Sequence, residues 1–146
     1  MPSLSAAARE LLTAGRVAHL ATADQYARPH VVPIVFVWRE TVLYTPLDRK
    51  PKREDDWHAL RRVRNIETNG RVAIVVDRYG EDWSRLAWVL LEGVATILES
   101  GDERDAAAKL LREKYAQYET LPLEGRPIVR IEIEHEAEWS SETPSP

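Results

Sequence analysis

The sequence predicts a mainly β protein with helices, in which an antiparallel six-stranded β-barrel carries α-helices at its periphery. Three observations support this class. The predicted strands follow one another as hairpins, no strand–helix–strand unit repeats, and 146 residues is the length of one domain. We expect residues 1–140 to form that single domain and residues 141–146 to form a disordered tail.

The expected elements follow a definite order. They are a helix over 3–14, strands over 17–23, 31–38 and 41–45, a helix over 56–69, strands over 72–77 and 86–99, a helix over 100–118 and a strand over 128–134. Ser5 can cap the first helix and Gly15 can end it. The polar segment 24–29 ends in proline, which predicts the turn of a hairpin.

The run 31–38 is rich in β-branched residues and shows no polar alternation, so both of its faces should be covered. Pro33 lies within it and removes one ladder hydrogen bond, which predicts an edge strand or a bulge. A plain edge strand explains this proline. A backbone that turns toward a bound planar ligand explains it equally.

Later elements carry their own markers. Leu60, Val63 and Ile66 mark one apolar face of the second helix. Glu92-Gly93 interrupts the longest strand and predicts a bulge or bend, which small barrels need at their corners.

The last helix and strand are also marked. Ser100 and Glu103 match a capping box that opens the helix. Apolar and charged residues alternate cleanly over 128–134, which predicts a half-exposed strand.

Composition narrows the function. The net charge of −4 is not typical of a nucleic-acid binder, so we expect no such partner. The absence of Cys excludes disulfides, thiolate nucleophiles and iron–sulfur clusters. No apolar run approaches about 20 residues, and the N-terminus lacks a signal-peptide pattern. We therefore expect no membrane association and a cytoplasmic location.

Motifs for metal binding or catalysis are missing from the sequence. The four histidines show no spacing that makes a metal pair, and no acidic cluster completes a coordination sphere; they are His19, His30, His58 and His135. No nucleophile elbow, phosphate-binding glycine loop or dinucleotide fingerprint is present. We expect no metal site and assign no catalytic residue.

Two features could bind a ligand. Four cations fall within five positions at Arg49, Lys50, Lys52 and Arg53. They form either a solvated loop or a site that captures phosphate or carboxylate. The sequence also contains five tryptophans, which could serve the core and a dimer contact or could wall an aromatic ligand; they are Trp38, Trp57, Trp83, Trp88 and Trp139.

Six stretches carry a family resemblance: RPHVVPIVF at 28–36, YT at 44–45, DRKPK at 48–52, NGRVAIVVD at 69–77, EDWSRL at 81–86 and EG at 92–93. In this order they resemble the pyridoxamine-phosphate-oxidase-like family, whose fold is the FMN-binding split β-barrel. More narrowly, they are similar to its deazaflavin branch, which uses coenzyme F420. The resemblance covers roughly residues 5–140.

The resemblance implies a homodimer with two cofactor sites at its interface. It places the strand around Val32 and Ile34 along the ring system, and Tyr44-Thr45 with the basic loop at the phosphate and acidic tail. The cofactor-binding residues we expect are His30, Val31, Val32, Pro33, Ile34, Tyr44, Thr45, Arg49, Lys50, Lys52, Trp88 and Trp139.

The function implied is an oxidoreductase that binds coenzyme F420 and transfers a hydride to or from a small organic acceptor. A chain without Cys, metal cluster or catalytic triad is consistent with a borrowed cofactor. An FMN-dependent enzyme of the same family is one alternative. A non-enzymatic flavin- or tetrapyrrole-binding protein is another.

Overall fold

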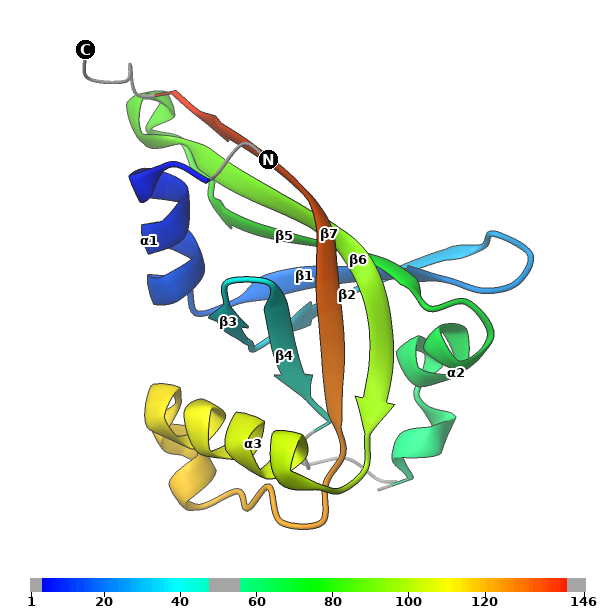
Figure 1. Cartoon of the computed structure of the whole chain (residues 1–146). Helices are drawn as coiled ribbons and strands as arrows, with labels where there is room; N and C mark the ends of the chain where they lie inside the picture. Colours follow the sequence, from blue (N-terminus) through cyan, green and yellow to red (C-terminus); the bar gives the residue numbers. More distant parts are fainter. Residues whose placement is uncertain (1–3, 48–55, 142–146) are drawn as a thin grey trace.

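One antiparallel sheet forms the body of the protein. The structure is a computed structural model and describes residues 4–47 and 56–141. Within these residues seven strands pair in the order β2-β1-β5-β6-β7-β4-β3 (Figure 1). They are β1 (Ala18–Ala23), β2 (Pro29–Ile34), β3 (Val37–Arg39), β4 (Val42–Pro46), β5 (Arg71–Arg78), β6 (Ala87–Leu98) and β7 (Ile128–Ser140). The mainly β class is confirmed, with seven strands in place of six.

Three α-helices lie around the sheet (Figure 1). They are α1 (Ala6–Ala14), α2 (Arg61–Thr68) and α3 (Asp102–Lys114), and shorter 3₁₀ turns are η1 (Trp57–Ala59), η2 (Trp83–Arg85) and η3 (Ala116–Glu119). As predicted, Ser5 caps α1 and Gly15 ends it. The prediction that the second helix begins near Asp56 is wrong. The Asp56 carboxylate instead accepts the His58 N–H at 3.0 Å and caps η1, so α2 starts later.

The seventh strand arises because the predicted strand over 31–38 changes partners. Its first part, β2, pairs with β1, and its last part, β3, pairs with β4. β2 is an edge strand, which confirms the prediction drawn from Pro33. The prediction that both faces of this run are covered is wrong within one chain, because 63% of Val31 is exposed.

The two edges of the sheet are consecutive in sequence. β2 and β3 stand at opposite ends of the strand order, yet only Val35 and Phe36 separate them. Three residue steps span at most about 11 Å, so the sheet must curl until its edges approach each other there. This curl produces the split barrel that the family resemblance implies.

Side chains from the end of α3 close this approach, which we call the seam. The hydroxyl of Tyr115 accepts the Phe36 N–H at 3.1 Å and lies 2.9 Å from the Arg16 carbonyl, to which it can donate. The Lys114 ammonium donates to the Phe36 carbonyl at 2.9 Å. Phe36 is fully buried, and these bonds satisfy both of its backbone groups away from water.

Two apolar clusters lie on either side of the sheet. The larger one fills the barrel and includes Leu20, Phe36, Ile74 and Leu91. The smaller one packs α3 and η3 against the sheet and includes Leu111, Tyr115 and Leu123.

Two further predictions need correction. Ser100 does not cap α3, because Gly101 takes that position with φ of 106°. Glu103 instead reaches the sheet, where it accepts hydrogen bonds from Tyr44 and Arg130 at 2.6 and 2.7 Å. The final strand continues past Glu134 to Ser140 because β6 offers it a partner along its full length. Residues 142–146 of the predicted tail lie outside the described residues.

A bulge bends the longest strand pair. The register of β6 against β7 shifts between Glu92 and Gly93, which confirms the predicted bulge. A Cβ on Gly93 would lie 1.9 Å from the carbonyl oxygen of Glu132, so only glycine fits at this crossing of two backbones.

We expect Gly93→Ala to lower the free energy of unfolding by about 1–3 kcal/mol, because β7 must move away to admit the methyl group. Urea unfolding followed by circular dichroism measures the loss. Gly80→Ala is the matched control, since nothing lies within 4 Å of a Cβ there. Equal unfolding midpoints for the two variants would show that the backbones do not cross this closely.

Candidate functional site

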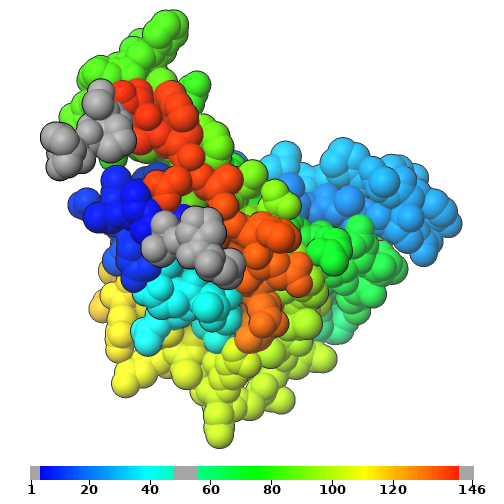
Figure 2. Space-filling model, turned by 45° about the horizontal axis from the view of Figure 1, so that its top comes forward, coloured from blue at the N-terminus to red at the C-terminus, as the bar shows by residue number. Residues whose placement is uncertain are grey.

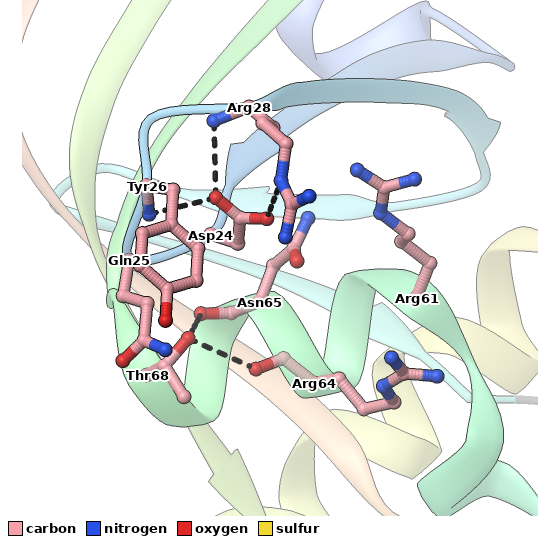
Figure 3. A pocket seen from close by; sticks show the side chains of 8 residues that line it. All are labelled: Asp24, Gln25, Tyr26, Arg28, Arg61, Arg64, Asn65 and Thr68. Atoms are coloured by element: carbon pink, nitrogen blue, oxygen red, sulfur yellow. Dashed lines mark hydrogen bonds and ion pairs between the residues drawn. The ribbon is translucent and has the colours of Figure 1, made fainter.

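A cationic cavity lies between the β1–β2 turn and one face of α2 (Figure 3). Its volume is about 410 Å³, which is within the range of small-molecule sites. We call it the arginine pocket. It is lined by Asp24, Gln25, Tyr26, Arg28, Arg61, Arg64, Asn65 and Thr68.

The turn side of the arginine pocket is held by one carboxylate. Asp24 accepts the backbone N–H groups of Tyr26 and Arg28 at 2.8 and 3.0 Å, and the Arg28 Nε at 2.7 Å. The backbone hydrogen bond from Arg28 is the main cause that lowers the pKa of Asp24. Ala27 takes a positive φ of 62° in the same turn. The turn therefore fixes the stem of Arg28 and leaves the outer nitrogens of its guanidinium at the cavity.

The helix side contributes two more guanidinium groups. Within residues 4–47 and 56–141, the side chains of Arg61 and Arg64 form no hydrogen bond or ion pair. The first turn of α2 holds no acidic residue, and its cap, Leu60, makes no side-chain hydrogen bond. The helix N-terminus and the two side chains thus add positive charge, and no carboxylate among residues 4–47 and 56–141 pairs with either guanidinium.

Charge in this cavity favours an anionic ligand. Three arginines and one aspartate, Asp24, line the cavity. Asp24 already forms an ion pair with Arg28. Guanidinium groups bind phosphate and carboxylate through paired N–H donors. The arginine pocket is therefore suited to a phosphate or a similar anion.

Polar groups continue from the arginine pocket into the barrel. Asn65 is buried and donates its Nδ2 to the Thr22 hydroxyl at 2.9 Å. His30 is paired directly across from Thr22 on β2, and its Nδ1 is buried without a partner in the described structure. A buried nitrogen without a partner costs free energy, which suits a position that a ligand or water completes.

The predicted residues of β2 divide between two faces. Val32 and Ile34 pack against the core inside the barrel, on the same side as His30. Val31 and Pro33 point outward and are exposed. Strand alternation therefore prevents all five residues from touching one face of a ring.

Tyr44 and Thr45 lie on β4, near the other edge of the sheet. Thr45 is buried. The Tyr44 hydroxyl donates to Glu103, and burial followed by this carboxylate raises the pKa of Tyr44 to about 12. This tyrosine stays neutral and joins β4 to α3.

Trp88 and Trp139 are direct cross-strand partners on β6 and β7. They lie far from the arginine pocket, because Trp88 pairs with Asp77 at the end of β5 and the pocket adjoins the start of β5 at Thr68. The eight residues of β5 span roughly 24 Å. One chain therefore does not bring the tryptophans and the arginines together.

The tryptophans belong instead to an apolar outer face of the sheet. Cross-strand register places on it the apolar residues Ala21, Val31, Pro33, Ala73, Val75, Trp88, Leu90, Ala137 and Trp139, together with the polar residues His19, Asp77, Glu92 and His135. Of these, Val31 and Trp139 are 63% and 44% exposed. Figure 2 shows the β5–β6 connection (green) and the β1–β2 hairpin (light blue) projecting from the body.

The remaining predicted residues, Arg49, Lys50 and Lys52, lie outside the described residues. The sequence predicted anion binding by these three residues and did not reveal the arginine pocket. A signal was present in the sequence, because Arg61, Arg62 and Arg64 open a helix without any acidic residue in its first turn.

Among residues 4–47 and 56–141, no group of three or more His, Asp or Glu side chains could hold a metal ion. No described helix combines the length and the apolar character that crossing a bilayer requires.

The chain belongs to the pyridoxamine 5'-phosphate oxidase family, whose profile matches residues 4–140. No curated protein sequence matches it significantly.

Solved structures share its fold. A conserved hypothetical protein of Mycobacterium tuberculosis has a TM-score of 0.74 at 18% identity, with 95% of this chain and 86% of the other covered. The heme storage protein HutZ of Vibrio cholerae has 0.70 at 20% identity, with 90% of each chain covered. An F420 reductase has 0.65 at 21% identity, with 92% of this chain and 98% of the other covered.

Proposed function

We propose that this protein is an oxidoreductase that binds coenzyme F420 and transfers a hydride to or from a small organic acceptor. The observation that carries the proposal is the arginine pocket, where Arg61 and Arg64 have no partner among the described residues. Two findings support the proposal. The chain belongs to the pyridoxamine 5'-phosphate oxidase family, and it shares its fold with an F420 reductase.

The residues of the chain would bind and orient the cofactor. Arg28, Arg61 and Arg64 would hold its phosphate, and Arg49, Lys50 and Lys52, predicted to contact both the phosphate and the acidic tail, would bind the tail. When bound, F420 supplies the hydride carrier that the chain lacks. No nucleophile is needed, because aligned donor and acceptor suffice for hydride transfer.

We further propose that the outer face pairs with a second copy of the chain. This would cover Val31 and Trp139, and it would bring the tryptophans of one copy toward the arginine pocket of the other. A shared site of this kind agrees with the separation of the two residue groups within one chain.

FMN is the second candidate for the same pocket, because it also carries a phosphate. F420 differs in its additional carboxylates, which favours it at a cationic surface. A fold shared with HutZ makes heme a third ligand to test.

Titration of the purified protein with F420, FMN and hemin separates these functions. We expect F420 to bind at least tenfold more tightly than FMN, with a preference that shrinks as salt rises. The double variant Arg61→Gln/Arg64→Gln should lose at least tenfold in F420 affinity, since each charge-assisted contact contributes about 1.5–3 kcal/mol.

The control is Arg39→Gln/Lys109→Gln, which removes the same charge from exposed positions outside the pocket. If FMN binds more tightly than F420 at every ionic strength, the protein is an FMN-dependent enzyme. If hemin does, the protein is a heme-binding protein. Equal losses in the two double variants would remove the arginine pocket from the site.

The proposed dimer can be tested by measuring the mass of the protein in solution. Light scattering should give about twice the 16.7 kDa of the chain at micromolar concentration. Val31→Glu should shift the protein toward the monomer, because it buries a charge in the contact. Ala106→Glu, on an exposed position of α3, should leave the mass unchanged. A monomer for the unmodified chain would rule out a site shared between copies.

A further inference from the structure

A second cavity opens beside the seam, at the end of the β1–β2 hairpin away from the arginine pocket. It has a volume of about 280 Å³. The six residues of β1 separate the two cavities by roughly 20 Å, because Val17 lines this one and Asp24 lines the other. We call it the seam pocket.

Apolar groups make most of its wall. Val17, Val35 and Leu121 contribute aliphatic surface, and the rings of Tyr115 and Tyr118 contribute aromatic surface. The two rings meet edge to face, with centroids 6.2 Å apart, and both residues are buried. Such a wall is preformed, so a ligand could bind without reorganising it.

Two cations border this apolar wall. The Arg16 guanidinium lies 4.5 Å from the centroid of the Tyr115 ring and donates to the Lys114 carbonyl at 3.0 Å. The Lys114 ammonium lies 3.9 Å from the centroid of the Phe36 ring. Burial, followed by the nearby Arg16, lowers the pKa of Lys114 to about 8.

No carboxylate balances these cations in the part of the chain that the structure describes. Arg16 and Lys114 form hydrogen bonds to backbone carbonyls and no ion pair. None of the residues that line the seam pocket is acidic. The two adjacent cations beside this apolar cavity therefore have no anionic partner among the described residues. A small bound anion would provide one.

We propose that the seam pocket binds a small monocarboxylate whose body is aromatic or aliphatic. Arg16 receives the carboxylate, and the valine, leucine and tyrosine side chains cover the body. The ligand contacts residues on both sides of the seam, so binding stabilises the closed sheet. This site is independent of the proposed cofactor function.

Calorimetric titration with 3-phenylpropionate and its neutral amide tests the proposal on the full chain. We expect the acid to bind at least tenfold more tightly than the amide, because only the acid forms a charge-assisted contact. Arg16→Gln should remove that difference. Lys109→Gln removes the same charge from an exposed position of α3 outside the pocket and should preserve it.

A second measurement locates the ligand. Nuclear Overhauser contacts should join its ring protons to the methyl groups of Val35 and Leu121. Equal binding of acid and amide, no binding of either, or contacts to other methyl groups would each overturn the proposal. The titrations contain no cofactor, so their failure leaves the F420 proposal untouched.

Discussion

The short connection between β2 and β3 is the constraint on which the rest of the structure depends. Because Val35 and Phe36 alone separate the two sheet edges, the sheet has to curl, and Tyr115 and Lys114 satisfy the backbone groups that the curl buries. Gly93 supplies the bend on the opposite side, where β6 crosses β7. The curl encloses one face of the sheet as the core, while α3 and η3 cover part of the other face and leave Val31 and Trp139 exposed on it.

The same geometry explains why the candidate cofactor residues fall into separate groups. The arginine pocket adjoins the start of β5, and the tryptophan pair adjoins its end. In a phosphate-bearing flavin or deazaflavin the ring system and the phosphate belong to one small ligand, which cannot place its ring at the tryptophans and its phosphate at the arginines of the same chain. Pairing of the outer faces of two copies would cover the exposed apolar side chains. It would also bring the arginines of one copy toward the tryptophans of the other.

Local patterns in the sequence predicted much of the fold. Ser5 acts through its hydroxyl on the backbone of its own helix, and Gly15, Pro33 and Glu92-Gly93 act through their own backbone, so cap, edge and bulge could be predicted directly. The division of the run 31–38 into two strands could not be predicted in this way. It depends on pairing with a second partner, β4, which lies far from β2 in the strand order. The arginine pocket was missed for the same reason. Arg28 precedes Arg61 by 33 residues and meets Arg61 and Arg64 only when the β1–β2 turn folds over α2.

A mixed dimer tests the shared site most directly. One subunit carries Arg61→Gln/Arg64→Gln and the other carries Trp88→Ala/Trp139→Ala, and the two are purified together through different tags. If arginines and tryptophans from different chains form each site, the mixed dimer contains one intact site and should bind one F420 with the affinity of the unmodified protein. Both parent variants should bind weakly. A mixed dimer without any tight site would contradict the account.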